Sequence, residues 1–157
     1  MTGSLRRLAL PALLMTVLAG CGLVGPDTYE LDEKHIQVDE GEEFTLSVPV
    51  ATAMGEWWYL TSPEPDPDVV RKNGKREDIE ADEDVDGSGS GTDFFDFKAV
   101  GPGTTTIRLI QCPHGACVGG GDAGGPITPS PVPGGSPTPD KKYRATIHTY
   151  TVTVRKP

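Results

Sequence analysis

The sequence is poor in positive charge. Its 14 Lys and Arg residues stand against 23 Asp and Glu, which gives a net charge of −9. Nucleic-acid binding is driven by basic side chains that displace counterions from phosphates, so this balance argues against a nucleic-acid partner. It argues equally against docking on an anionic membrane surface through the protein's own charge.

The sequence also lacks the short motifs of common enzymes. It contains no G-x-S-x-G nucleophile turn, no H-E-x-x-H zinc motif and no phosphate-binding loop. Its three histidines show no spacing typical of a general base or a triad. The acidic run Glu77–Asp84 lacks the ligand spacing of an EF-hand and predicts a solvated surface instead. We therefore expect no enzymatic activity, no cofactor and no catalytic or metal-binding residues.

After residue 20, no segment carries apolar residues at the sustained spacing of 3.6 that predicts a helix. Short runs alternate apolar and polar residues instead, which is typical of half-buried strands. We expect 35–39 to be an edge strand, Trp58 to lie in the core and Trp57 to face outward. Six or seven strands separated by turn signals predict an antiparallel β-sandwich. The segments with this pattern are 35–39, 41–50, 55–60, 93–100, 104–111 and 147–154.

The one long apolar run lies near the start of the chain. It covers residues 8–18, follows Arg6 and Arg7, and ends in Leu18-Ala19-Gly20-Cys21. About eleven residues suit the core of a signal peptide and are too few to span a bilayer. Small residues before a cysteine resemble a bacterial lipobox, in which Cys21 receives the lipid after residues 1–20 are removed.

We therefore predict a lipoprotein signal peptide over 1–20 and a lipidated tether over 21–33. The protein would be anchored to the bacterial cell membrane through its lipid and exposed on the extracytoplasmic side. Loss of residues 1–20 leaves 12 basic residues against 23 acidic ones, a net charge of −11. The folded domain is expected over 34–157.

Two segments inside this domain are poor in apolar residues. Segment 62–91 is rich in proline and acidic residues, and segment 118–142 is rich in Gly, Pro, Ser and Thr. Such compositions bury too little apolar surface to offset the entropy lost on ordering. We expect both segments to be flexible insertions.

Cys112 and Cys117 remain as a pair once Cys21 carries the lipid. In an oxidising compartment, two cysteines five positions apart most simply form a disulfide. A weaker alternative is a soft-metal site built from Cys112, His114 and Cys117, with His35 or His148 as the fourth ligand.

The order of these features resembles the chagasin-like inhibitors of papain-type cysteine peptidases, over about residues 35–155. The resemblance implies an immunoglobulin-like β-sandwich of about seven strands that acts as a monomer. Its partner would be a papain-like cysteine peptidase, which it would inhibit reversibly. The motifs that carry the resemblance are Val38–Glu42, Phe44–Leu46, Gly55, Trp58, Phe95–Ala99, Gly103-Thr104, Ile107–Leu109 and Tyr150–Val154.

In that family, three loops at one end of the sandwich form a wedge that fills the peptidase cleft. The first loop here keeps the glycine of the family's Asn-Pro-Thr-Thr-Gly, and Cys112-Pro113-His114 stands where the family has Arg-Pro-Trp. Because Arg and Trp are common binding hot spots, an envelope interaction or adhesion module on the same fold remains an alternative. The resemblance assigns the wedge to Thr52, Ala53, Met54 and Gly55, to Gly87, Ser88, Gly89, Ser90 and Gly91, and to Pro113 and His114.

Overall fold

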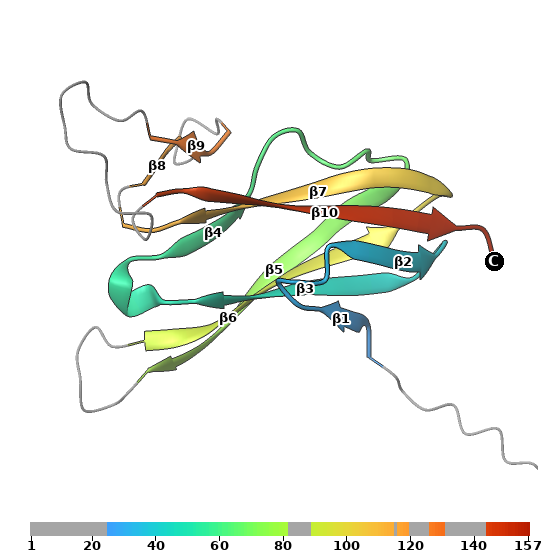
Figure 1. Ribbon diagram of the computed structural model, residues 1–157. Coiled ribbons are helices and arrows are strands. Elements are labelled where there is room, and N and C mark those ends of the chain that lie inside the picture. The colour runs from blue at the N-terminus through green and yellow to red at the C-terminus, as the bar shows by residue number, and fades with distance from the viewer. Residues whose placement is uncertain (1–24, 82–88, 115, 120–125, 131–143) are drawn as a thin grey trace, which may run out of the picture.

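The computed structural model describes residues 25–81, 89–114, 116–119, 126–130 and 144–157. These residues form strands and one short 3-10 helix, and two sheets face each other (Figure 1). In chain order the elements are β1 (Asp27–Tyr29), β2 (His35–Asp39), β3 (Glu43–Val50), η1 (Thr52–Met54), β4 (Trp57–Leu60), β5 (Val70–Ala81), β6 (Gly89–Ala99), β7 (Gly103–Cys112), β8 (Cys117–Val118), β9 (Thr128–Pro129) and β10 (Thr146–Arg155).

The predicted immunoglobulin-like β-sandwich is confirmed. One sheet has the strand order β1-β3-β6-β5 and the other has β2-β10-β7-β4, so 35–39 forms an edge strand as predicted. Most neighbours are antiparallel, but β1 pairs with β3 and β2 pairs with β10 in parallel. The N-terminal segment runs first along one sheet and then along the other, which gives each sheet one parallel edge.

The core lies between the sheets and follows the alternation seen in the sequence. Inward residues of β3 and β6 pack against those of β7 and β10, and the Phe44 and Phe97 rings stack with centroids 5.5 Å apart. Full burial of each large apolar side chain contributes about 1.5–3 kcal/mol. The buried members from these four strands are Phe44, Leu46, Val48, Val50, Phe95, Phe97, Ala99, Ile107, Leu109, Tyr150, Val152 and Val154.

The two adjacent tryptophans of β4 lie on opposite faces, as predicted. Trp58 is fully buried, and its Nε1–H donates a hydrogen bond to the Pro49 carbonyl oxygen at 2.9 Å. Trp57 is 43% exposed. Successive side chains in a strand point to opposite faces, so the burial of one indole requires the other to face outward.

The tether expected over 21–33 differs from the structure at β1. Asp27 lies opposite Phe44 in the parallel pair, and the Tyr29 ring meets the Phe44 ring edge-on at 6.2 Å. The packed domain therefore begins before residue 34. A strand of three residues is too short to show a recognisable alternation of apolar and polar residues, so the sequence did not predict β1. Cys21 and the predicted signal peptide lie outside the described residues.

The flexible insertion expected over 62–91 is wrong for residues 70–81, which form β5 and pair with β6. Segment 62–91 was judged by its polar composition, but β5 gains its order from backbone pairing. On its outer face, Arg76 donates two hydrogen bonds to Asp96, at 2.8 and 2.9 Å. These bonds hold the pKa of the Asp96 carboxyl below its usual value. The described acidic residues of the run, Glu77, Asp78 and Glu80, are exposed as predicted.

Part of the insertion expected over 118–142 is also ordered. Cys117 and Val118 of β8 pair with Pro129 and Thr128 of β9 in a two-stranded sheet. Residues 120–125 and 131–143 lie outside the described part of the chain. Among the residues that the structure describes, no helix is long and apolar enough to cross a membrane.

Replacing Trp58 by Phe should lower the free energy of unfolding by about 2 kcal/mol. The change removes the donor to the Pro49 carbonyl and leaves part of the indole volume empty. The matched control is Trp57→Phe, which alters an exposed position and should change stability by no more than about 0.5 kcal/mol. Urea denaturation of both variants measures the difference, and equal losses would contradict the opposite facing of the two indoles.

Candidate functional site

Two loops and the adjoining ends of β5 and β6 lie together at the end of the sandwich opposite the C-terminus (Figure 1). The first loop, residues 51–56, joins β3 to β4, and the third loop, residues 113–116, joins β7 to β8. The second connection, between β5 and β6, covers 82–88 and lies outside the described residues, together with the predicted Gly87 and Ser88. The predicted Gly89, Ser90 and Gly91 form the first residues of β6.

The first loop is a tight turn. Thr52–Met54 form one turn of 3-10 helix, and the Gly55 N–H donates to the Thr52 carbonyl oxygen at 2.8 Å. Gly55 has φ +65°, a left-handed conformation that side chains other than glycine's rarely adopt. The Glu56 N–H donates to the Ala51 carbonyl oxygen at 3.2 Å and closes the loop where β4 begins. The backbone of the loop is thus held by its own hydrogen bonds.

The first loop contacts the beginning of β6. The Thr52 hydroxyl donates to the Gly89 carbonyl oxygen at 3.0 Å. A Cβ atom at Gly89 would lie only 2.5 Å from Thr52 Oγ1, so this close approach requires glycine. Two regions that the sequence separates by 37 residues are therefore joined.

The third loop is closed by the predicted disulfide. Cys112 and Cys117 are bonded, with their Cα atoms 5.6 Å apart. Inside the ring, the Ala116 N–H donates to the Pro113 carbonyl oxygen at 2.8 Å. The bond joins the end of β7 to β8 and fixes the base of the long connection that follows.

The first and third loops also meet directly. A Cβ atom built on Gly55 would lie 2.8 Å from His114 Nδ1, so the imidazole packs against the backbone of Gly55. Below this contact, Trp57 lies opposite Cys112 in the pairing of β4 with β7. The structure therefore brings the described residues of all three predicted regions into one cluster, which we call the loop end.

Exposed apolar side chains gather at the loop end. Within the described part of the chain, four large apolar residues are exposed: Met54 at 63%, Val118 at 46%, Trp57 at 43% and Ile147 at 38%. Met54 belongs to the first loop and Trp57 follows it. Val118 follows Cys117, and Ile147 lies opposite Ile110 near the beginning of β10. Clusters of exposed apolar residues mark interaction sites on soluble proteins.

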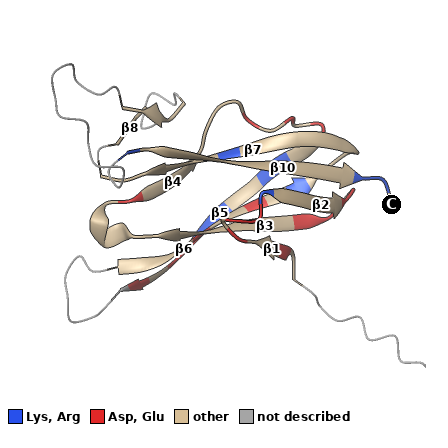
Figure 2. Ribbon diagram, in the orientation of Figure 1, with Lys and Arg blue, Asp and Glu red and all other residues tan. Residues whose placement is uncertain are grey.

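Acidic residues lie on another side of the loop end. A hollow of about 530 Å³ is lined by Glu56, Asp78 and Glu80, and no described residue of its lining is basic. The Gln111 amide donates to Glu56 Oε2 at 2.9 Å and holds that side chain in place. Figure 2 shows acidic residues at the start of β4 and the end of β5. A partner that covers this side meets negative charge.

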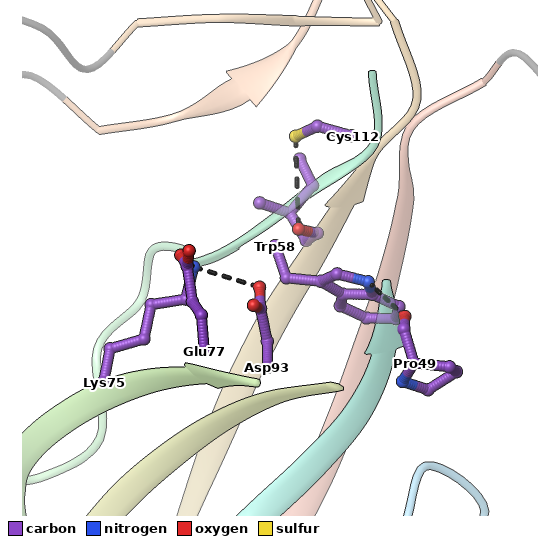
Figure 3. A network of polar contacts seen from close by, with 7 residues as sticks. Pro49, Trp58, Lys75, Glu77, Asp93 and Cys112 are labelled. Carbon is purple, nitrogen blue, oxygen red and sulfur yellow. Dashed lines mark hydrogen bonds and ion pairs between the residues drawn. The ribbon is translucent and has the colours of Figure 1, made fainter. Parts of the chain in front are cut away.

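A buried ion pair lies beneath the loop end (Figure 3). Asp93 is 1% exposed, and Lys75 Nζ lies 3.0 Å from its Oδ2 and 2.8 Å from Glu77 Oε1. Burial raises the pKa of Asp93, and Lys75 offsets only part of that shift. Desolvation lowers the pKa of Lys75, but its hydrogen bonds with Glu77 and Asp93 outweigh this effect and raise it overall. Lys75 is therefore the counter-ion that allows Asp93 to be charged inside the fold.

The metal alternative is not supported. Cys112 and Cys117 are bonded to each other, so neither offers a thiolate. His148 packs against Trp58 with ring centroids 4.9 Å apart, and His35 lies opposite Thr151, far along β10 from the third loop. Among the described residues, no group of three His, Cys, Asp or Glu side chains is arranged to hold a metal ion.

Three residues beside the loop end were missed by sequence reasoning. Ile147 was detectable, because it is out of phase with the buried Tyr150 and Val152 in the same strand. Glu56 and Asp78 could not be detected from the sequence, because their proximity depends on the pairing of β5 with β6.

Comparison with known proteins agrees with the geometry. The sequence model of the chagasin family peptidase inhibitor I42 matches residues 37–116, just over half of the chain. The chain belongs to the chagasin family. The resemblance seen in the sequence motifs is confirmed, and members of the family are peptidase inhibitors, not enzymes. No curated protein sequence matches the chain.

Three solved structures are similar to this chagasin-family chain. The cysteine protease inhibitor EhICP2 from Entamoeba histolytica matches with a TM-score of 0.52 and 14% identity, over 82% of this chain and 95% of that one. The solution structure of Amebosin gives 0.48 and 16%, over 83% and 100%. PbICP-C in complex with falcipain-2 gives 0.42 and 12%, over 85% and 95%. At such identity, the likeness to EhICP2 shows a common fold.

Replacing Lys75 by Met should lower the free energy of unfolding by about 2 kcal/mol at pH 7, because Asp93 then stays buried without its counter-ion. A carboxyl whose pKa is raised by folding favours the folded state below its unfolded pKa of about 3.9, and this advantage is lost as pH rises through the folded pKa. Without Lys75, the pKa of Asp93 in the folded state should rise further. Asp93 would then become protonated and neutral as the pH falls towards 4, so the stability of the variant should approach that of the wild type.

Urea denaturation between pH 4 and pH 8 measures this convergence. The double variant Lys75→Met/Asp93→Asn has no buried charge to neutralise, so its difference from wild type should vary less with pH. A Lys75→Met deficit that is constant over the whole range would contradict the counter-ion role.

Proposed function

We propose that the protein is a reversible inhibitor of papain-like cysteine peptidases and that the loop end enters and occludes the active-site cleft. The observation that carries the proposal is the convergence of the loops, with Thr52 bonded to Gly89, Gly55 packed against His114, and Met54 exposed at the turn. Membership of a family of peptidase inhibitors supports the activity. The choice of cysteine peptidases rests on the sequence motifs and on the likeness to a structure described as a cysteine protease inhibitor.

The proposed mechanism is steric occlusion. Cleavage requires that a carbonyl carbon be held within about 3–3.5 Å of the attacking atom in the correct orientation. The first loop is a 3-10 turn that Gly55 and its backbone hydrogen bonds hold closed. A peptide bond in this turn is not presented as an extended substrate would be, so the loop fills the cleft without being cut.

The constraints on the loops reduce the cost of binding. A flexible loop loses conformational entropy when it is immobilised at an interface, at about 0.5–1.5 kcal/mol for each side chain ordered. The disulfide and the contact between Gly55 and His114 order the first and third loops before binding. The apolar surface of Met54 can then contribute its burial with little offsetting loss.

The membrane anchor belongs to the same proposal. A lipid on Cys21 would hold the domain at the extracytoplasmic face of the cell membrane. Asp27 lies opposite Phe44, and β3 then runs six residues to Val50 before the first loop. At about 3.3 Å per residue this separates the start of β1 from the loop end by roughly 20 Å. An anchor that precedes β1 would lie at the end of the sandwich opposite the loops and would leave the loops free to meet a peptidase.

Replacing Met54 by Asp should raise the inhibition constant at least tenfold. The substitution removes a favourable burial free energy of about 1.5–3 kcal/mol. It also forces a carboxylate to lose its hydration when the loop enters the cleft. The control is Glu40→Ala, an exposed change in the turn between β2 and β3, at the opposite end of the sandwich. The assay titrates residues 22–157 against papain and a cathepsin L-like peptidase with a fluorogenic peptide.

Both variants should keep the wild-type melting temperature, because Met54 and Glu40 are exposed. If wild type inhibits and Met54→Asp inhibits equally, the first loop is not in the cleft.

Replacing Cys21 by Ser should move the protein from the membrane fraction to the soluble extracytoplasmic fraction. Without the thiol, no thioether to the lipid can form. The matched control is Cys112→Ser/Cys117→Ser, which removes the disulfide, keeps Cys21 and should remain with the membrane. Fractionation and the mass of the N-terminal peptide measure the outcome, and membrane retention of the Cys21→Ser protein would refute the lipid anchor.

A second candidate function is an envelope interaction module without inhibitory activity. The third loop favours it, because Cys112-Pro113-His114 lacks the Arg and Trp of the family motif and continues into β8 and β9. Failure of the folded wild-type protein to inhibit either peptidase at micromolar concentration would favour this second function over the first.

A further inference from the structure

The outer face of the β2-β10-β7-β4 sheet carries apolar residues next to the loop end. In the strand register, Ile110 lies between Tyr59 of β4 and Ile147 of β10, and Cys112 lies opposite Trp57. Paired residues in neighbouring strands point to the same face, so these side chains form one surface. It faces away from the sandwich core.

The β8–β9 hairpin is built onto this surface. Ile110 has no exposed area although it is not part of the sandwich core, and Cys112 is only 5% exposed. The Thr61 hydroxyl donates to the Ile127 carbonyl oxygen at 2.7 Å, which ties the residue before β9 to the end of β4. Together with the disulfide, this contact ties the hairpin to the edge strand β4 and to the end of β7.

Three large apolar side chains are exposed on the hairpin and on the strands beside it. Trp57, Val118 and Ile147, which we call the outer-face patch, are 43%, 46% and 38% exposed. Val118 follows the disulfide-bonded Cys117, and the other two flank the covered row on β4 and β10. The extra hairpin thus adds one apolar residue to two that the sheet already presents.

The outer-face patch is continuous with the loop end. Trp57 stands two residues after Gly55 and opposite Cys112, at the point where the first and third loops begin. A partner that covers Met54 and His114 therefore also approaches Trp57. The acidic hollow lined by Glu56, Asp78 and Glu80 is the loop end's other distinct flank. Two flanks of different chemistry can fix the orientation of one bound partner.

We propose that the outer-face patch is a second contact surface for the peptidase that the loops inhibit, and that it binds an apolar area beside the active-site cleft. This inference rests on the proposed function and adds to it a determinant of which peptidase is bound tightly. A few side chains contribute most of the energy of such a contact, and tryptophan, here Trp57, is among the commonest of them. The β8–β9 hairpin adds Val118 beside it on an ordered strand, which limits the entropy lost on binding.

The test compares two patch variants, Val118→Asp and Ile147→Asp, with Met54→Asp and with Thr104→Asp. Thr104 is exposed on β7, on the same face as Ile110 but at the opposite end of the strand, so it carries the same new charge away from the patch. Inhibition constants are measured against papain and a cathepsin L-like peptidase. Melting temperatures show that each variant is folded, and Val118→Ala and Ile147→Ala replace any variant that is not.

Each patch variant should raise the inhibition constant about tenfold or more for at least one peptidase, and by different factors for the two enzymes. Thr104→Asp should leave both constants within twofold of wild type. If Met54→Asp weakens inhibition while the patch variants do not, the loops bind and the patch inference alone is wrong.

Sedimentation velocity of the wild type and of Ile147→Asp tests another occupant of the patch. A wild-type dimer that Ile147→Asp converts to monomer would assign the patch to a second copy of the chain and overturn the inference. Absence of inhibition by folded wild-type protein would overturn it together with the proposed function.

Discussion

The antiparallel pairing of β4 with β7 is the constraint on which the loop end depends. It places Trp57 opposite Cys112 and Trp58 opposite Gln111. With Trp58 in the core, Trp57 and Cys112 must both face outward. The disulfide therefore forms outside the sandwich and holds the third loop over the outer face, while Gln111 points inward and fixes Glu56. A register shift of one residue would reverse all of these positions.

The second constraint is electrostatic and concerns β5. In this edge strand, Lys75 and Glu77 lie on the face that is directed towards the opposite sheet, where apolar residues are usual. Lys75 compensates the buried charge of Asp93. The Lys75 ammonium group also lies over the Phe95 ring, with Nζ 5.5 Å from the ring centroid. An edge position makes this possible, because the ammonium group remains partly exposed to water. The strand that borders the acidic hollow is thus held by charge pairing as well as by the backbone ladder.

The central strands could be predicted from the sequence because their inner faces carry apolar residues at every second position, as in β3 from Phe44 to Val50 and in β10 from Tyr150 to Val154. Strand β5 could not, because its inner face includes charged residues whose partner, Asp93, comes from another strand. The disulfide could be predicted from the oxidising compartment that the signal peptide implies. The residues of the first loop could be predicted from the resemblance to the family motifs. The contact of His114 with Gly55 and the position of Ile147 opposite Ile110 depend on long-range register, which alternation alone does not specify. Composition misjudged segment 62–91 because backbone pairing leaves no compositional signature.

The proposed contact through the outer face would compensate for the absence of the family's Arg and Trp from the third loop. Those residues supply contact energy through large side chains on a loop. Here the loop is short and closed by a disulfide, and the chain continues into the β8–β9 hairpin, in which Val118 is exposed. In the proposed complex, apolar contact area lies on the outer face beside the loop instead of at the tip of the loop. Strand register already directs Trp57 outward. The hairpin therefore only has to hold Val118 in place to complete the apolar surface.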